Sequence, residues 1–352
     1  MFGTLEQHGI QRVLLFAEPQ LGLRAVVVLD DLTLGPAAGG IRTKSYADEP
    51  SAVVEASRLA RSMTRKCALA GLDAGGGKGV MMMRPELDRT AAFARLGEFI
   101  EELGGIFRTA GDLGTTAADL EAMATRTRYV ETDGRGLAEA VARGVEVCMS
   151  AALAVGNLPQ LSRSSVLIQG VGSMGAAVAR RLAPLGAELI LSDLDLERAQ
   201  ALARELGARV VSVDRALVES VDVFCPCADG GVLTESVASA TKAKLICGAA
   251  NDTLASPDIP ELLRQRGVIH VPDAISSAGA VIAGIGKSVM GLVDTGPLID
   301  GLGRVTSEVL EESFGVEAPP EWVARTRAAE RISVVRAARS AAASRDAIEA
   351  RD

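Results

Sequence analysis

Two lysines near a run of glycines have the residue types and spacing best suited to chemistry. Only six lysines occur among the 37 basic residues, yet Lys66 and Lys78 stand 12 positions apart, with Asp73 as the one charge between them. Arginine stays protonated at working pH, whereas burial can make a lysine release its proton. Lys78 directly follows residues 75–77, all glycine, where the backbone can come close to a ligand. The pair could therefore mark a site where a lysine releases its proton, with chance proximity as the plain alternative.

A second group of residues forms the pattern G-x-G-x-x-G at Gly170, Gly172 and Gly175. It lies between an expected strand and an expected helix, whose unpaired N–H groups can bind a pyrophosphate. Asp193 ends the next expected strand, where a carboxylate accepts hydrogen bonds from ribose hydroxyls and repels a 2′-phosphate. The pattern predicts a Rossmann-type site for NAD rather than NADP, the alternative being a glycine-rich turn without a ligand.

Asp112 is the third candidate for chemistry. It lies where an expected strand becomes a loop and then a helix, and α/β sheets keep their sites at such strand ends. The chain has only two histidines, His8 and His270, and neither stands beside a nucleophile motif. Proton transfer must therefore fall to lysine or carboxylate groups. The plain alternative is that Asp112 caps the helix that begins near Thr115 or Thr116.

The elements that must position these residues alternate between strands and helices, which is typical of α/β proteins. The sequence predicts strands over residues 12–17, 23–29, 80–83, 107–110, 166–169, 189–191, 210–211, 221–225, 245–247 and 268–271. It predicts helices over 50–65, 90–103, 137–155, 174–185 and 196–206, and a turn over 35–40. The regular strand–helix units of the second half indicate a doubly wound parallel sheet.

Length and composition suit a two-domain globular protein. At 352 residues the chain exceeds the roughly 250–300 residues at which single cores stop growing. We expect a substrate domain over residues 1–140 and an NAD domain over 141–324, around a cleft. The helix over 325–352 is expected to pack back on the first domain.

Charge and cysteine content limit the possible partners and the cellular compartment. A net charge of −8 argues against a nucleic-acid partner. No apolar run reaches the roughly 20 residues of a membrane span, and the N-terminus lacks the pattern of a signal peptide. The five cysteines are odd in number and lie mostly in apolar segments, which favours reduced thiols in a cytoplasmic protein. No metal motif is apparent, because Cys225 and Cys227 have no companion pair.

Several blocks, taken together and in order, resemble the glutamate/leucine/phenylalanine/valine dehydrogenase superfamily, most closely its short leucine and phenylalanine branch. The blocks are residues 35–42, 58–66, 75–78, 111–115, 169–172, 225–231, 248–251 and 272–273. The resemblance implies an NAD-dependent, reversible oxidative deamination of an L-amino acid to a 2-oxo acid and ammonia. It also implies a homo-oligomer, a dimer or larger, built through the first domain.

By this resemblance, Lys66 binds the substrate carboxylate, Lys78 is the general base, and Asp112 exchanges a proton with the substrate amine. On the substrate side we expect, in addition, Ala38, Gly39, Gly40, Met63 and Ser277. Gly39 and Gly40 would let the backbone approach the substrate. At the cofactor we expect Gly170, Gly172, Ser173, Met174, Gly175, Asp193, Cys227, Ala228 and, near the nicotinamide ribose, Asn251.

The sequence departs from the superfamily at three places around these residues. Val141 stands where we align a threonine, Ser277 stands in place of an asparagine, and Ala38 replaces a larger apolar residue. A smaller side chain at Ala38 predicts a wider pocket, suited to bulky aliphatic or aromatic substrates. Two alternatives stay open: a shikimate-type dehydrogenase that uses a Lys/Asp pair, and an NAD-binding regulator without turnover.

Overall fold

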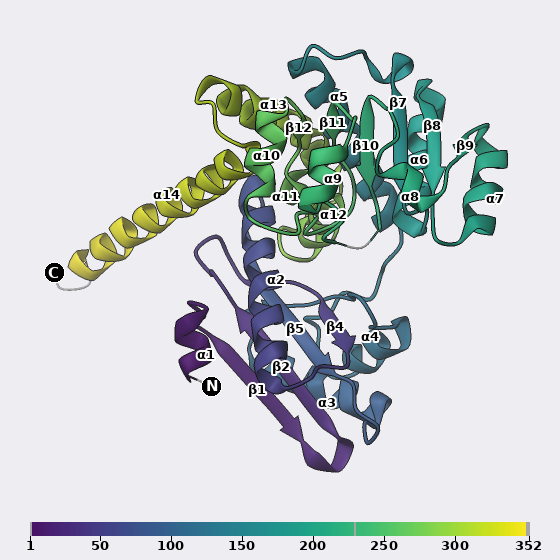
Figure 1. Ribbon diagram of the computed structural model, residues 1–352. Helices are drawn as coiled ribbons and strands as arrows, with labels where there is room; N and C mark the ends of the chain where they lie inside the picture. The colour runs from purple at the N-terminus through teal and green to yellow at the C-terminus, as the bar shows by residue number, and fades with distance from the viewer. Residues whose placement is uncertain (1, 229, 350–352) are drawn as a thin grey trace. The chain divides into compact units, whose positions relative to one another are not determined.

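The computed structural model describes residues 2–228 and 230–349. The chain forms two compact units (Figure 1). Unit 1 comprises Met1–Gly134, Gly284–Leu292 and Ala328–Asp352, and unit 2 comprises Arg135–Ala283 and Val293–Arg327. Each unit has its own six-stranded sheet.

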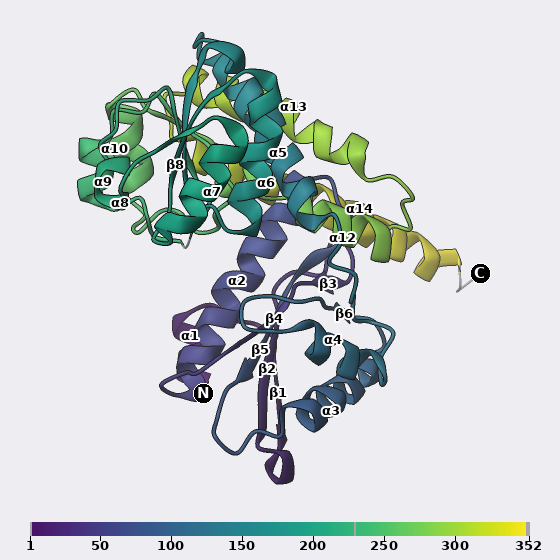
Figure 2. The ribbon, with the colours of Figure 1, turned by 90° about the vertical axis from the view of Figure 1, so that its right-hand side faces the viewer.

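Unit 1 is a mixed sheet with helices on both faces. Its strands run in the order β1-β2-β5-β3-β6, and β4 also pairs with β5. Figure 2 shows α2 on one face of this sheet and α3 and α4 on the other. The elements are α1 (Phe2–Gln7), β1 (Val13–Glu18), β2 (Leu23–Leu29), β3 (Ala37–Ala38), β4 (Ile41–Lys44), α2 (Glu49–Leu69), β5 (Gly75–Met82), α3 (Arg89–Glu102), β6 (Phe107–Arg108) and α4 (Ala117–Ala124).

The alternation of side chains along β2 explains why both faces of this sheet are covered. Val26 and Val28 belong to an apolar cluster with Val53 and Ala60 of α2. Val27, between them, belongs to a separate cluster with side chains of α3 and α4. Because successive residues of a strand point to opposite faces, an apolar run such as residues 25–29 of β2 needs a helix layer on each side.

Unit 2 is a parallel sheet in the order β12-β11-β10-β7-β8-β9. The chain order reverses between β7 and β10, which is the switch point where doubly wound sheets bind ligands. The strands are β7 (Ser165–Gln169), β8 (Glu188–Ser192), β9 (Arg209–Val210), β10 (Val223–Pro226), β11 (Leu245–Ile246) and β12 (Ile269–His270). The structure confirms the predicted α/β class with a Rossmann-type doubly wound domain.

Helices cover both faces of the unit 2 sheet, with α9 and α10 on one face and α5, α6 and α13 on the other (Figure 2). In chain order the helices are α5 (Leu137–Val155), α6 (Ser173–Leu182), α7 (Leu196–Leu206), α8 (Val213–Ala216), α9 (Glu235–Ala240), α10 (Ile259–Gln265), α11 (Asp273–Ser276), α12 (Gly279–Ser288), α13 (Gly296–Gly315) and α14 (Pro320–Glu349). Short 3₁₀ turns span Pro19–Leu21, Leu161–Arg163 and Ala183–Leu185.

Several predicted boundaries were wrong. The helix expected over residues 50–65 continues to Leu69 and so includes Lys66, and the helix expected to begin at residue 325 begins at Pro320. The strand expected over residues 80–83 begins at Gly75, because the glycines pair with neighbouring strands instead of forming a loop. The turn expected over residues 35–40 contains β3, which pairs with β5 and β6. The helix expected over residues 174–185 ends at Leu182, and Pro184 stands in a following 3₁₀ turn.

The C-terminal part of α14 belongs to unit 1, and the last three residues of the helix expected over 325–352 lie outside the described residues. Within the described part of the chain, no helix has both the length and the apolar character to cross a membrane. The same residues contain no group of three or more His, Cys, Asp or Glu side chains placed to hold a metal ion.

Candidate active site

Unit 1 contains a buried ion pair between two of the predicted catalytic residues. Lys78 lies in β5 and is only 6% exposed. Its Nζ lies 2.7 Å from Oδ2 of Asp112, whose side chain is 25% exposed. An ammonium group taken out of water needs such a partner, and a partner that is partly open to solvent can still reach a ligand. The structure therefore brings the predicted base and the predicted proton-exchanging acid together.

Backbone hydrogen bonds to β4 hold Asp112 in place. Ile41 N–H donates to the carbonyl of Ala110 and Thr43 N–H donates to the carbonyl of Leu113, each at 2.9 Å. The loop that carries Asp112 therefore runs beside β4 and hydrogen-bonds to it as a neighbouring strand does. The alternative that Asp112 caps the next helix was wrong, because the side-chain cap of α4 is Thr116.

The charges at this pair set its protonation. Burial lowers the pKa of Lys78 below its ordinary range, Asp112 opposes that shift, and the nearby cations Arg42 and Lys66 lower the pKa further. Burial acts to raise the pKa of Asp112, but Lys78 and Arg42 outweigh it and bring that pKa to about 2. Asp112 is therefore a carboxylate at neutral pH, and Lys78 releases its proton more easily than an exposed lysine does.

Arg42, for which no role was predicted, joins this pair from β4. Its Nε donates to Oδ2 of Asp112 at 2.8 Å, and its Nη1 donates to Oε1 of Glu55 at 2.8 Å. Lys44 Nζ lies 2.7 Å from the other oxygen of Glu55. A signal was present, since Arg42 and Lys44 alternate with the buried Ile41 and Thr43 and so share one face of a short strand.

Lys66, the predicted carboxylate anchor, is buried in the last turn of α2. The end of that helix is held by Arg331 of α14, within unit 1. The Arg331 guanidinium donates to the carbonyls of Cys67, Ala68 and Leu72 at 3.0, 2.8 and 3.1 Å. The last carbonyls of a helix, here those of Cys67 and Ala68, have no partner inside it, so this arginine satisfies groups that α2 cannot pair itself.

Internal packing explains the glycines beside the site. A methyl group at Gly39 would lie 1.8 Å from the carbonyl oxygen of Gly77, and one at Gly40 would lie 2.6 Å from that of Gly111. At Gly76 it would meet the carbonyl of Ala60 in α2 at 2.1 Å. These glycines allow strands and a helix to approach one another, so a role in contacting substrate is not needed to account for them. Such a role stays a prediction.

Two more residues predicted on the substrate side lie in unit 1. Ala38 is buried in β3, between β5 and β6. Met63 is half-buried on α2, three residues before Lys66. A residue three positions away lies on a neighbouring part of the same helix surface, so Met63 and Lys66 share one side of α2.

In unit 2 the glycine loop has the shape that a pyrophosphate needs. Gly170 adopts a φ of +89°, and a methyl group there would lie 2.7 Å from the backbone nitrogen of Ala228. A methyl group at Gly175 would lie 1.9 Å from the carbonyl oxygen of Gly170. At Gly172, by contrast, a methyl group meets no atom within 4 Å. The outer glycines therefore fold the loop, and the middle one leaves space for a ligand.

The start of α6 also fits an anion. No side chain caps this helix at its N-terminus, where Gly172 precedes the exposed Ser173 and the half-buried Met174. The first N–H groups of a helix need partners from outside it and carry a partial positive charge. The residues present therefore fit the pyrophosphate of a dinucleotide.

Asp193 follows β8 directly and faces this loop. Its Oδ2 accepts a hydrogen bond from Val171 N–H at 2.7 Å, and its Oδ1 accepts one from Asp195 N–H at 2.8 Å. Arg198 Nη1 lies 3.9 Å from Oδ1. The carboxylate thus binds the backbone of the glycine loop and lies where an adenosine ribose is expected. The sequence alone did not indicate this contact with the loop.

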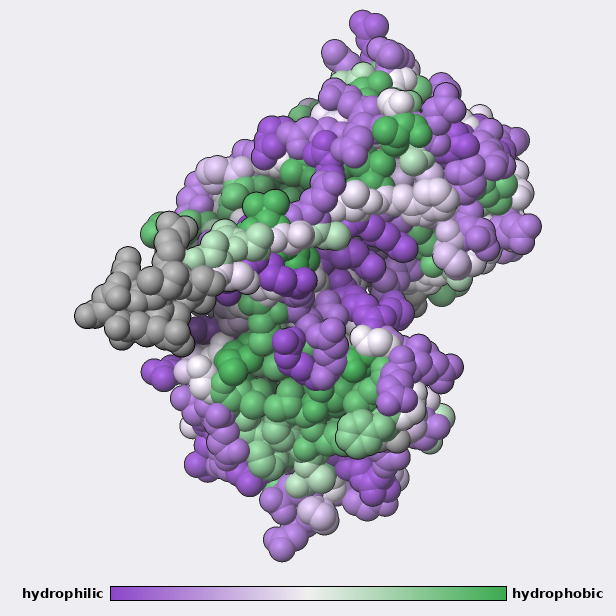
Figure 3. All heavy atoms as spheres, turned by 90° about the vertical axis from the view of Figure 1, so that its left-hand side faces the viewer, coloured by the Kyte–Doolittle hydropathy of each residue, from purple (hydrophilic) through white to green (hydrophobic). Residues whose placement is uncertain are grey.

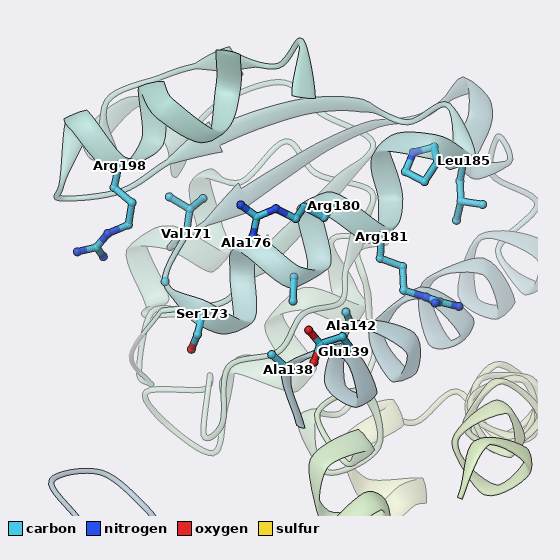
Figure 4. A pocket seen from close by; sticks show the side chains of 13 residues that line it. Ala138, Glu139, Ala142, Val171, Ser173, Ala176, Arg180, Arg181, Leu185 and Arg198 are labelled. Carbon is cyan, nitrogen blue, oxygen red and sulfur yellow. The ribbon is translucent and has the colours of Figure 1, made fainter. Parts of the chain in front are cut away.

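An open groove of about 990 Å³ borders the glycine loop (Figure 4). Its lining includes Val171, Gly172 and Ser173, and it continues along α6 to Arg180 and Arg181. Glu139 of α5 lies on its other side. The groove does not include the other predicted cofactor residues, so it represents at most one part of a dinucleotide site.

The remaining predicted residues form two contacts at the carboxyl end of the parallel sheet. Cys227 N–H donates to the carbonyl of Gln169 at 2.7 Å, which places Cys227 and Ala228 beside the glycine loop. Ser277 Oγ donates to Oδ1 of Asn251 at 3.0 Å. The structure thus brings together a residue predicted to contact substrate and one predicted to contact cofactor.

Comparisons with known proteins agree with this geometry. Residues 14–129 match the family described as Glu/Leu/Phe/Val dehydrogenase, dimerisation domain, and residues 191–285 match Glutamate/Leucine/Phenylalanine/Valine dehydrogenase. The chain is 32% identical to a leucine dehydrogenase of Thermoactinomyces intermedius, over 97% of this chain and 95% of that one. The chain belongs to the glutamate/leucine/phenylalanine/valine dehydrogenase family. It is an amino acid dehydrogenase that uses a nicotinamide cofactor.

Two further similarities support this assignment. This dehydrogenase is 33% identical to a phenylalanine dehydrogenase of Bacillus thermotolerans, over 80% of this chain and 77% of that one. The crystal structure of L-tryptophan dehydrogenase from Nostoc punctiforme matches with a TM-score of 0.84 and 29% identity, covering 95% of this chain and 99% of that one. Residues 149–231 also match the NAD-binding domain of D-isomer specific 2-hydroxyacid dehydrogenases. The family assignment sets aside the shikimate-type and the non-catalytic alternatives.

Proposed function

We propose that this dehydrogenase catalyses the reversible, NAD-dependent oxidative deamination of a bulky L-amino acid. The amino acid, water and NAD⁺ give the 2-oxo acid, ammonium, NADH and a proton. The observation that carries the proposal is the buried contact between Lys78 and Asp112, made in a chain of this family. When bound, the nicotinamide supplies the acceptor for the hydride that leaves the α-carbon.

Three side chains of unit 1 would act on the substrate. Lys66 holds the substrate carboxylate as a fixed positive charge. Lys78, with a pKa lowered by burial, takes a proton from the attacking water and then stabilises the oxyanion as an ammonium group. Asp112 exchanges a proton with the substrate nitrogen, which must leave as ammonia.

We assign the substrate role to the first domain, residues 1–140, and the cofactor role to the second, residues 141–324. Support for this division is that Lys66, Lys78 and Asp112 all lie in unit 1, whereas the glycine loop lies in unit 2. Val141 and Ser277 both lie in unit 2, where Ser277, predicted on the substrate side, bonds to Asn251, predicted on the cofactor side.

We favour NAD over NADP as the cofactor. A carboxylate at Asp193 can accept hydrogen bonds from ribose hydroxyls and repels a 2′-phosphate. Within the described residues, Arg198, at 3.9 Å, is the only cation that forms an ion pair with Asp193. Because Asp193 offsets this cation, the local charge does not favour a phosphate group.

A bulky aliphatic or aromatic substrate is supported by Ala38 and by the names of the relatives. Ala38 has a smaller side chain than the apolar residue expected there. The relatives named above are leucine, phenylalanine and tryptophan dehydrogenases. We therefore expect 2-oxo acids with isobutyl, benzyl or indolylmethyl side chains to be aminated faster than pyruvate.

We propose a homo-oligomer that forms through unit 1. Residues 14–129 match a dimerisation domain, and β1 is an edge strand of the sheet. Hydrophobic side chains gather on one face of this unit (Figure 3), and Phe2 and Leu15 are 80% and 55% exposed. A large exposed apolar area on a folded unit usually marks an interaction site. Sedimentation of the purified protein would test this.

We also propose that the protein works in the cytoplasm. All five cysteines are free, and four of them are buried in apolar surroundings, where burial raises the pKa of Cys67 and of Cys148 to about 12. Thiols of this kind suit a reducing compartment. Recovery of activity in the cytosolic fraction of the source cells is the corresponding measurement.

The decisive test of the reaction is amination in a spectrophotometer. The protein is mixed with NADH, ammonium and a panel of 2-oxo acids, and the absorbance of NADH is followed with and without ammonium. Ammonium-dependent oxidation of NADH is the expected result, and no rate with any 2-oxo acid would overturn the proposal. Ala38→Leu should slow the bulkiest substrate most, whereas an unchanged order of substrates would argue against Ala38 as a pocket residue.

A further inference from the structure

Arg42 contacts two carboxylates that come from different elements. It lies in β4, which pairs with β5 so that Arg42 stands opposite Val80, two residues after Lys78. Its Nε reaches Asp112 and its Nη1 reaches Glu55 of α2. About a fifth of its side chain is exposed, compared with roughly half for the surface arginine Arg24. The two bonds fix the plane of the guanidinium group, because a planar fork cannot rotate while both ends are held.

Arg42 and Lys78 bind the same oxygen of Asp112. Arg42 Nε lies 2.8 Å from Oδ2, and Lys78 Nζ lies 2.7 Å from that atom. Among the described residues no hydrogen bond to Oδ1 is formed. A carboxylate accepts about four hydrogen bonds, two for each oxygen, so the second oxygen retains its full capacity. The arrangement occupies one oxygen and leaves the other for a ligand.

We propose that Arg42 is a positioning residue for the amination reaction, which holds Oδ2 of Asp112 so that Oδ1 exchanges the proton with the substrate nitrogen. Glu55 supports this role by anchoring the other end of the guanidinium group, and Lys44 in turn anchors Glu55. The inference rests on the proposed function, since it requires Asp112 to be the group that exchanges this proton.

Two features distinguish this role from a general ion pair. Lys78 alone would leave the carboxylate free to rotate about its single contact, whereas a second donor at 2.8 Å restricts it. Lys78 must also change its charge during the reaction, but arginine stays protonated at every working pH. Arg42 is therefore the contact that keeps Asp112 oriented when Lys78 has lost its proton.

The charges around Asp112 set the expected pH effect. They are Arg42 and Lys44 on β4, Lys78 on β5, Glu55 and Lys66 on α2, with the phenol of Tyr46 nearby. Replacement of Arg42 by a neutral residue removes a positive charge close to both catalytic groups. The pKa of Asp112 and the pKa of Lys78 should both rise, because each group holds its proton more tightly when a nearby positive charge is removed.

The experiment compares Arg42→Gln and Arg42→Lys with the control Arg24→Gln. Arg24 also pairs a strand with a glutamate of α2, but at an exposed position away from the pair. For Arg42→Gln we expect kcat to fall roughly 10- to 100-fold, as for a misplaced catalytic group, while KM for the amino acid changes less than about threefold. The rise of kcat/KM with pH should move to higher pH. Arg42→Lys should recover part of kcat, and Arg24→Gln should match the wild type.

Outcomes separate this inference from the proposed function. A wild-type protein without ammonium-dependent activity would overturn the proposed function and the role of Arg42 with it. An active wild type with equal kcat and an equal pH profile in Arg42→Gln would overturn the role of Arg42 alone. If Arg42→Gln does not fold, Arg42→Lys decides: it keeps the charge but not the fork, so wild-type kcat in that variant would also refute the role. Unfolding curves of each variant establish which case applies.

Discussion

The two candidate sites of this dehydrogenase are formed by different kinds of groups. In unit 1 the site consists of charged side chains that already pair with one another, with Asp112 between Lys78 and Arg42. In unit 2 it consists of backbone: a loop in which Gly172 leaves space and the start of α6 offers N–H groups. The first kind of site is changed by removing charge, and the second by adding volume. Loss of charge in unit 1 and added volume in the glycine loop of unit 2 should therefore have separable effects.

Removal of the buried ammonium group should have the largest effect. Lys78→Ala takes away the proposed base, and general base catalysis contributes roughly 10²- to 10⁴-fold to a rate. We expect kcat to fall within that range while NADH binding is retained, because the glycine loop lies in the other unit. Steady-state kinetics and fluorescence titration with NADH measure the two quantities. Lys242→Ala, at an exposed lysine, is the matched control. Full kcat in Lys78→Ala would refute the proposed base.

Addition of one methyl group should affect stability differently at Gly175 and at Gly172 of unit 2. Gly175→Ala places that methyl 1.9 Å from the carbonyl oxygen of Gly170, so we expect the free energy of unfolding to fall by roughly 1–3 kcal/mol. Gly172→Ala meets no atom within 4 Å, so stability should change by less than about 0.5 kcal/mol. The affinity for NADH should fall in both variants.

Urea unfolding and NADH titration of the same two proteins check this contrast. If Gly172→Ala binds NADH as tightly as the wild type, the open space at Gly172 is not where the pyrophosphate lies. If Gly175→Ala is as stable as the wild type, the loop must relax more easily than its packing against Gly170 indicates.

The pH profile tests the charges of unit 1 without a mutation. The proposed mechanism needs neutral Lys78, so kcat/KM for oxidative deamination should rise with pH as that group loses its proton. Burial lowers the pKa of Lys78, so this rise should occur below the ordinary lysine range. Asp112, with a pKa of about 2, stays ionised and adds no step between pH 4 and 9. Below the pKa of Lys78 the rate falls about tenfold per pH unit. A profile that is flat through this range would show that Lys78 does not titrate in the reaction.

The smallest effect is expected at Asp193. Each oxygen of Asp193 accepts one hydrogen bond, from Val171 N–H or from Asp195 N–H. Asp193→Asn replaces one of these oxygens with an amide nitrogen that cannot accept, so one of the two hydrogen bonds is lost. We expect NADH affinity to weaken by roughly 0.5–1.5 kcal/mol, the usual net worth of one hydrogen bond. The preference for NADH over NADPH should narrow as the negative charge is lost. Titration with both cofactors measures this, and an unchanged ratio would argue against Asp193 as the basis of cofactor choice.

Local patterns could be predicted where a few neighbouring residues decide the outcome. The Gly170–Gly175 loop is an example, because a strand, a tight turn and a helix start follow one another within ten residues. Thr116 is another: the expected helix start was confirmed, with Thr116 as the cap and Asp119 completing a reciprocal pair of bonds. Where distant segments decide, prediction was wrong. The glycines at residues 75–77 belong to a strand because α2 and the neighbouring strands approach it closely.

The sequence by itself determined the family and the α/β class, and it singled out Lys66, Lys78 and Asp112 as candidates, because ordered blocks and short periodic patterns are visible without coordinates. Only the tertiary structure decided that Arg42, 70 residues before Asp112, holds the same oxygen as Lys78. It also decided that Asp193 braces the loop beside it and that Ser277 bonds to Asn251. These contacts depend on which strands pair and in which register, and that is set by the burial of whole faces rather than by neighbouring residues.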